Sequence, residues 1–236
     1  MEIGEIFSDA LRYPLDNIKA LAVYCILGII LGIAIAGTVA GIALGASAQN
    51  ALAIIGTGLI GIIIALIIGF FINGYELDIV KYGIHRSNTA PEIDFVRQFV
   101  NGVKLFVVVV VYFLIPIIIA AILAIIFQHW LSLILSVIVF IVFALAAFMG
   151  NCRLAKTEDL GYALSIGEAI GDISKVGIGK LILFILAVFV LYLIVFLLGS
   201  ALSHWNSIVG GIFLGIFGIY FTFFASRAMG LLYSDV

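Results

Sequence analysis

Charged side chains are scarce in this 236-residue chain, and three long stretches contain none. Asp, Glu, Lys and Arg make up 10% of the residues and apolar types 65%, against about 25% and about 45–50% in soluble proteins. The uncharged runs are 20–75, 105–152 and 181–226. A soluble domain of this size could not hide so much apolar surface, so the composition predicts a protein that resides in lipid.

Each run is too long for one membrane crossing and suits two, because about 20 apolar residues cross the ~30 Å hydrocarbon core. We therefore expect three helical hairpins and six transmembrane helices, in an all-α membrane protein. The runs are continuously apolar rather than alternating, which favours helices over a barrel. The expected span pairs are 20–46 with 51–72, 105–127 with 131–150, and 181–202 with 207–226.

Lys and Arg are missing from the expected hairpin tips, and all 11 lie in the four blocks that flank the uncharged runs. Both ends of a hairpin lie on one side of a membrane, so these blocks share one compartment. The positive-inside rule places them in the cytoplasm. We expect a multi-pass protein of the cell membrane whose N and C termini are both cytoplasmic.

Other absences narrow the possible functions. No charged block is polybasic, which argues against nucleic-acid binding. The two cysteines, Cys25 and Cys152, lie near the cytoplasmic ends of spans, where a structural disulfide is not expected. Catalytic motifs such as Gly-x-Ser-x-Gly, His-Glu-x-x-His and the Walker loop are lacking. We expect no catalytic residue, cofactor or metal, and an enzyme acting on lipid ranks third among the hypotheses.

Glycine is plentiful, with 25 residues. The stretch 56–61 matches the dinucleotide-binding pattern, but it lies inside an uncharged run and not in a water-facing strand–turn–helix unit, so helix packing explains it better. Small-xxx-small spacing lets two helix backbones approach closely. The candidate helix-packing positions, whose partner is either internal or another subunit, are Gly28, Gly32, Gly37, Gly41 and Gly45.

Histidine and tryptophan stand together at two expected tips, as His129-Trp130 and His204-Trp205. The two histidines could share a metal if the hairpins were neighbours, but two ligands are too few for a typical zinc site. Tryptophan is a common anchor at the membrane–water interface. We therefore interpret Trp130 and Trp205 as interface anchors.

Intramembrane acids and bases are absent from the predicted spans, which disfavours a proton-coupled transporter. The polar side chains left near the cytoplasmic exits are Asn73 and Asn151, the candidates for a polar path. Pro116 could kink its span. A passive pore, or a pathway for an apolar or lipid substrate, stays open.

The blocks and runs also repeat. Alignment of the last cation before each run, Lys19, Lys104 and Lys180, brings Asp9 onto Asp94. The chain is thus predicted to be a single membrane domain, 1–236, with a threefold internal repeat whose units are approximately 1–75, 76–152 and 153–236.

Each unit opens with a segment of helical periodicity. In the first unit the apolar stripe is Ile3, Phe7, Ala10, Leu11, Leu15 and Ile18. We expect amphipathic helices that lie in the cytoplasmic interface and precede each hairpin. The alternative is ordinary connectors packed against one another.

Several stretches resemble a known family. Asp-Ala-Leu-Arg-Tyr-Pro at 9–14 opens the chain, Gly-Tyr at 74–75 closes the first hairpin, and Pro-Glu-Ile-Asp-Phe at 91–95 precedes Phe-Val-Asn-Gly-Val-Lys at 99–104. Together they resemble the uncharacterised prokaryotic, mainly archaeal, integral membrane family called domain of unknown function 4013. Ile93 replaces the aromatic residue usual there. The resemblance implies no established activity, so it assigns no catalytic residue.

The predicted function is that of a membrane-embedded scaffold or complex subunit that organises partners or lipids. Its expected partners are membrane lipids and a protein partner or a second copy of the chain, with no nucleic acid. The alternative is a transporter or channel for an apolar or amphipathic solute, supported by the repetition, the glycine-rich first hairpin and Pro116.

Overall fold

The computed structural model describes residues 1–127 and 130–236, and of residues 207 and 208 it describes the backbone alone. Among these residues, six helices are long and apolar enough to cross a membrane, and no strand occurs. The all-α prediction with six apolar spans is therefore confirmed. The six are α2 (Ile18–Ser47), α3 (Ala51–Ile84), α4 (Phe95–Ile126), α5 (Trp130–Thr157), α8 (Ile178–Trp205) and α9 (Ser207–Tyr233).

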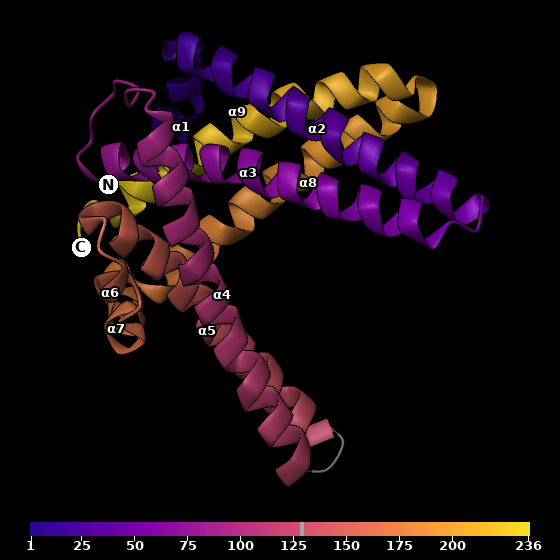
Figure 1. Cartoon of the computed structure of the whole chain (residues 1–236). Helices are drawn as coiled ribbons and strands as arrows, with labels where there is room; N and C mark the ends of the chain where they lie inside the picture. The colour runs from indigo at the N-terminus through magenta and orange to yellow at the C-terminus, as the bar shows by residue number, and fades with distance from the viewer. Residues whose placement is uncertain (128–129) are drawn as a thin grey trace.

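The long helices are arranged as three arms. α2 packs along α3, α4 along α5, and α8 along α9. Figure 1 shows the arms diverging from one region, which also holds both chain termini and the shorter helices α1 (Ile3–Asp16), α6 (Leu160–Ala163) and α7 (Ile166–Val176). We call this region the hub. It comprises residues 72–84 of α3, 146–155 of α5 and 219–233 of α9, with α1, α6 and α7 around them.

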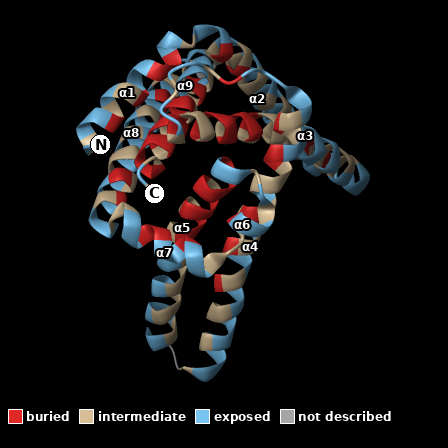
Figure 2. Ribbon diagram, turned by 90° about the vertical axis from the view of Figure 1, so that its left-hand side faces the viewer, coloured by how far each residue is buried: buried red, intermediate tan, exposed pale blue. Residues whose placement is uncertain are grey.

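Burial is concentrated in the hub, as the red segments of Figure 2 show. The backbones approach closely there because glycine stands at the contacts. A Cβ on Gly83 of α3 would lie 2.9 Å from the Cα of Gly230 on α9. A Cβ on Gly74 would lie 1.8 Å from the carbonyl oxygen of Gln98 on α4. Any side chain at these positions would push the helices apart, so the hub depends on these glycines.

The segments that lead into the three arms differ from one another. α1 is a separate helix, which contains Pro14 and gives way at Asn17 to α2. A pair of short helices leads to α8, and Gly177, with φ +93°, breaks the chain before it. The expectation that a distinct amphipathic helix precedes each hairpin is wrong for the second hairpin. Residues 95–104 form the first turns of α4, because the segment contains no proline and its Asn101-Gly102 pair keeps a helical backbone without a positive φ.

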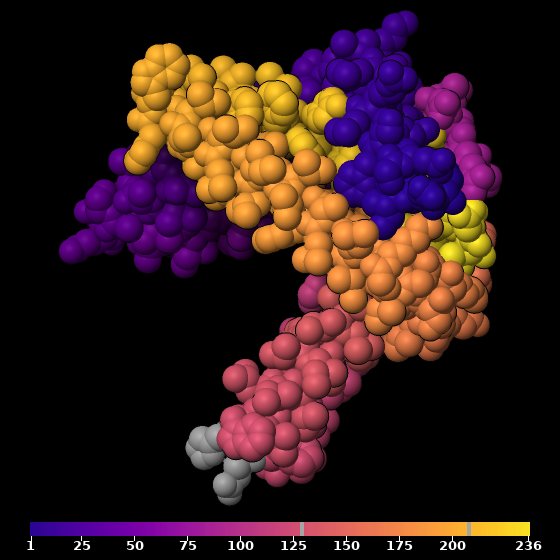
Figure 3. Space-filling view, turned by 180° about the vertical axis from the view of Figure 1, so that it is seen from behind, coloured from indigo at the N-terminus to yellow at the C-terminus, as the bar shows by residue number. Residues whose placement is uncertain are grey.

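Outside the hub the arms leave their apolar side chains uncovered. In the most apolar stretch of each of the first five spans, 6–17% of the residues are buried, against 33% in α9. Figure 3 shows the α4–α5 arm standing apart from the other two. Such surface is compatible with lipid or another membrane protein around the arms, not with water.

Candidate functional site

Each of the three helices at the centre of the hub carries one deeply buried charged side chain. On α3 this is Asp78, which is 3% exposed. Arg97 is the third residue of α4, and its Nη2 donates to Oδ2 of Asp78 at 3.0 Å. A buried carboxylate is tolerated when it is paired with a cation. The pair therefore fixes the beginning of α4 against the last turns of α3.

On α5 the buried charge is Arg153, which is 2% exposed. Its Nη1 donates to Oδ2 of Asp172 on α7 at 2.9 Å, its Nη2 donates to Glu168, and its Nε donates to the carbonyl of Tyr162. Asp172 also accepts a hydrogen bond from the hydroxyl of Tyr233 at 2.6 Å. This set ties α5 to α7 and to the last turn of α9.

On α9 the buried charge is Arg227, which is 1% exposed. Its Nε donates to Oδ1 of Asp9 on α1 at 2.8 Å. Its terminal nitrogens donate to the carbonyls of Tyr82 and Ser87 and to Oδ1 of Asn88. The five N–H donors of one guanidinium thus hold α1, α9 and the loop that follows α3.

Two carboxylates at the ends of the hub helices, Asp172 and Glu158, are kept ionised by their partners. Burial alone would raise the pKa of Asp172, but the hydrogen bond from Lys175 and those from its other partners outweigh it and hold the pKa below its usual value. The pKa of Glu158 is lowered chiefly by the hydrogen bond from Lys81, whose Nζ lies 2.7 Å from Oε1. At neutral pH these contacts are ion pairs.

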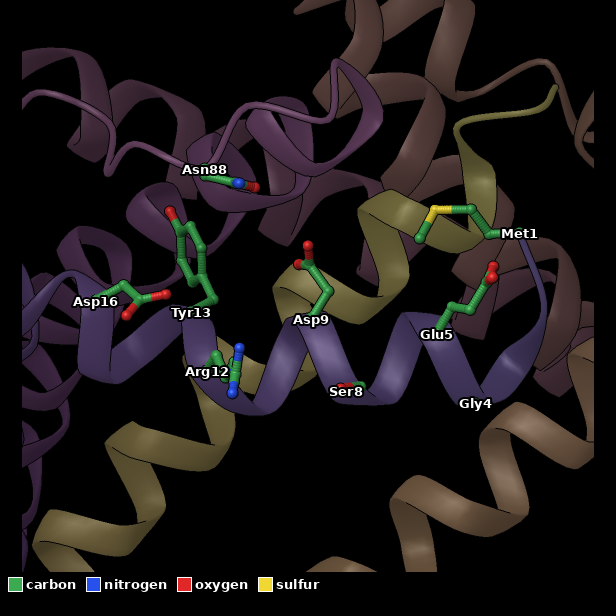
Figure 4. A pocket seen from close by; sticks show the side chains of 9 residues that line it. All are labelled: Met1, Gly4, Glu5, Ser8, Asp9, Arg12, Tyr13, Asp16 and Asn88. Carbon is green, nitrogen blue, oxygen red and sulfur yellow. The ribbon is translucent and has the colours of Figure 1, made fainter.

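A pocket of about 630 Å³ follows the polar side of α1. Figure 4 shows side chains from α1 around it, together with Asn88 from the loop after α3. Tyr13 is 3% exposed, and its hydroxyl has no hydrogen-bond partner among the described residues. Burial raises the pKa of this hydroxyl, so it stays protonated. The pocket is lined by Met1, Gly4, Glu5, Ser8, Asp9, Arg12, Tyr13, Asp16 and Asn88.

The arrangement of the His, Cys, Asp and Glu side chains and the state of the thiols bear on the chemistry open to the described residues. In residues 1–127 and 130–236, no group of three or more His, Cys, Asp or Glu side chains is placed to hold a metal. Cys25 is half-buried and Cys152 is buried, and both are free thiols. The polar groups at hand can pair with charge and hold helices together.

The glycines predicted to pack helices lie along α2. A Cβ on Gly41 would lie 2.4 Å from Cγ2 of Thr57, and one on Gly45 would lie 3.0 Å from the first turn of α3. A Cβ on Gly28 would lie 2.9 Å from Cγ1 of Ile219 on α9. These three positions thus adjoin helices of the same chain.

The other two positions of the stripe, Gly32 and Gly37, have open space where a Cβ would stand, with no atom within 4 Å. Their spacing resembles that of their neighbours, yet their helix face looks away from α3 and α9. Three of the five glycines on α2 therefore pack against helices of the same chain, and Gly32 and Gly37 are uncovered.

The two asparagines of the predicted polar path are half-buried on the inner helices, Asn73 on α3 and Asn151 on α5. Oδ1 of Asn151 is buried and has no hydrogen-bond partner in the described part of the chain. Trp130 and Trp205 stand at the far ends of their arms, 70% and 82% exposed. The paired residue His129 lies outside the described residues, so its relation to a second histidine stays a hypothesis.

Sequence reasoning did not single out the buried charges of the hub. A signal was present, because Arg153 and Arg227 are each the first charged residue after an apolar run. A charge at that point lies where the helix emerges from the membrane. It can therefore pair with an opposite charge on the segment that packs over the helix end. The partner, Asp172 in one case and Asp9 in the other, could not be deduced without the packing.

Comparison with protein-family models gives a match. The family model described as Protein of unknown function (DUF4013) matches residues 59–204, more than half of the chain. Neither the curated proteins nor the solved structures contain a match.

Proposed function

This chain belongs to the family described as Protein of unknown function (DUF4013), and because that description assigns no activity, we propose from the geometry that it is a membrane-embedded scaffold or complex subunit. It would organise protein partners or lipids between its arms. It would not act as an enzyme, and its partners would be lipids and another protein or a second copy of itself.

The observation that carries this proposal is the uncovered apolar surface of the arms. A helical protein that encloses its own solute path packs its spans against one another, whereas here most residues of the first five spans are unburied. The arms meet in the hub and separate beyond it (Figure 1). Surfaces of this extent are typical of helices that other membrane components cover.

The hub also supports the proposed threefold repeat of hairpins. The buried charge on the second helix of each arm pairs with the segment that leads into the next arm, and the last arm closes the cycle onto α1. The sign of the charges is reversed in one of the three. The pairs are Asp78 with Arg97, Arg153 with Asp172, and Arg227 with Asp9.

The proposed topology places both termini and the part of the hub formed by α6, α7 and the loop after α3 in the cytoplasm of a cell whose plasma membrane the other parts of the chain span. The terminal amine of Met1 lies 3.1 Å from Oδ2 of Asp235, which supports termini on one side. α1 would lie in the interface, since Leu11 and Leu15 are 40% and 61% exposed beside its charged face.

The test is the mass of the solubilised particle. The chain is extracted in mild detergent, and its mass is measured by native mass spectrometry and by light scattering. The proposal expects a homo-oligomer or a complex with a second membrane protein at a fixed ratio. A lone monomer with no retained lipid would contradict it.

One observation favours the alternative, a transporter or channel for an apolar or amphipathic solute. The unpaired Oδ1 of Asn151 could face a polar path along α5. Flux of such a solute into liposomes that is lost in Asn151→Leu, but kept in Ser132→Leu near the other end of α5, would support the alternative over the scaffold.

A further inference from the structure

Glu76 is an acidic side chain on α3 that the hub network does not engage. Asp78, two residues further along, is held by Arg97. Glu76 is half-buried and makes no hydrogen bond or ion pair with any residue that the structure describes. An ionisable side chain in a membrane helix is costly, and such residues commonly serve a function.

The carboxylate lies beside the middle of another span, away from the polar end of the hub. Glu76 is close enough to Tyr192 to act on it electrostatically, and Tyr192 is also close to the side chain of Thr222 on α9. Tyr192 stands near the centre of α8, inside the uncharged run 181–226. Its ring centroid is 5.6 Å from that of Phe221. Glu76, Tyr192 and Thr222 thus form a small polar group from three helices.

The surroundings of this group are apolar. The residues next to its members along the chain, Leu77, Leu191 and Phe221, belong to one hydrophobic cluster. Tyr192 is a titratable side chain on which the charge of Glu76 acts. A neutral tyrosine supplies no charge to balance a carboxylate.

The cations of the helices packed against α3 are engaged elsewhere. On α4, Arg97 binds Asp78 and Lys104 donates to the carbonyl of Glu158. The remaining cations are Arg153 of α5, held by Asp172; Lys156 of α5, stacked 5.7 Å from the ring of Tyr233; Arg227 of α9, held by Asp9; and Lys19 of α2, which is exposed. The carboxylate of Glu76 therefore has no cation partner within the described chain.

We propose that Glu76 is a proton-binding site in the membrane-embedded part of the protein. An unpaired carboxylate withdrawn from water is unfavourable, and uptake of a proton neutralises it. The carboxylate binds one proton from water to form a carboxylic acid and releases the same proton on return, with no other bond changed. This site goes beyond the proposed scaffold and does not depend on it.

A pair of carbodiimides tests the site on the full chain in lipid nanodiscs. The hydrophobic dicyclohexylcarbodiimide reacts with protonated carboxyls in apolar surroundings, and a water-soluble carbodiimide reacts with carboxyls exposed to water. Peptide mass mapping should find Glu76 modified by the hydrophobic reagent, several-fold faster at acid than at alkaline pH. The water-soluble reagent should leave it unmodified while it labels exposed Glu92.

Two variants serve as controls. Glu76→Gln should remove the hydrophobic adduct and keep the protein monodisperse, whereas Glu92→Gln should leave the adduct unchanged. Equal labelling of Glu76 by both reagents, or no labelling at any pH, would overturn the proposal. Protection by sodium at constant pH would also overturn it, because the site would then bind a metal cation and not a proton alone.

Discussion

Arg227 in α9 and Asp9 in α1 join the two ends of the chain, with Nε to Oδ1 at 2.8 Å and Nη2 to Oδ2 at 3.4 Å. The guanidinium is 1% exposed and the carboxylate 32%. A paired arrangement of two nitrogens and two oxygens is geometrically specific as well as charged. The contact makes the hub a closed arrangement, in which the first helix depends on the last.

Removal of Arg227 should therefore disrupt the hub. Arg227→Leu leaves Asp9 without its cation and the carbonyls of Tyr82 and Ser87 without a donor. Loss of one partner of a buried pair costs about 3–5 kcal/mol. Thermal unfolding in detergent should show a much lower midpoint than the native chain. Arg12→Leu, in the exposed pocket of α1, is the control, and an equal loss there would contradict the role of Arg227.

Acid should weaken the contact between Arg153 and Asp172. The pKa of Asp172 is lower in the folded chain than its ordinary value. Burial raises this pKa, but the hydrogen bonds from Lys175 and the other partners lower it by more. A depressed carboxyl pKa contributes stability above the unfolded-state pKa, and that contribution is lost as pH falls through the folded-state pKa.

The contribution of Asp172 to the unfolding free energy should accordingly be level near neutral pH and fall once the pH drops below about 4. Asp172→Asn should lower stability at neutral pH by roughly 3 kcal/mol and flatten the acid limb. Denaturant titration in detergent at neutral and acid pH measures both. If the variant kept the full acid dependence of the native chain, another carboxyl would be responsible.

The topology gives a labelling pattern. After Cys25 and Cys152 are replaced by alanine, single cysteines are introduced at Ser47, Ser203 and Thr157. Ser47 and Ser203 lie near arm tips, and Thr157 ends α5 in the hub. An impermeant maleimide added to intact cells should label the first two and not the third. Label at Thr157 before lysis would place the hub outside.

The six spans could be predicted because the absence of charge is a direct consequence of lipid. The ends of these helices could not be predicted in the same way, because a helix can continue through a charged block. α3 continues past Glu76 and Asp78 to Ile84, and α4 begins at Phe95, ten residues before the second uncharged run. Charged side chains there are accommodated by packing between helices, which no run of sequence reveals.

Packing between helices, which the sequence does not reveal, also decides which of the predicted site residues come together. Spacing identified Gly41 and Gly45 as packing positions but could not separate them from Gly32 and Gly37, because the partner helix decides which face is covered. Glu76 directly follows the first uncharged run, and only the packing of α3 against the third arm brings it beside Tyr192.

The crossing of α3 and α9 provides a last prediction. A Cβ on Gly230 would lie 2.3 Å from the carbonyl oxygen of Val80 and 2.8 Å from the Cα of Gly83. Backbone atoms cannot move aside as a side chain can, so Gly230→Ala must separate the helices, at a cost of about 1–3 kcal/mol. Gly215→Ala in the same helix meets open space and should be neutral or stabilising by up to about 1 kcal/mol, since alanine is the better helix former. Thermal unfolding of the two variants in parallel measures the difference. Equal midpoints would mean that α3 and α9 do not cross at these glycines, and the hub would need a different packing.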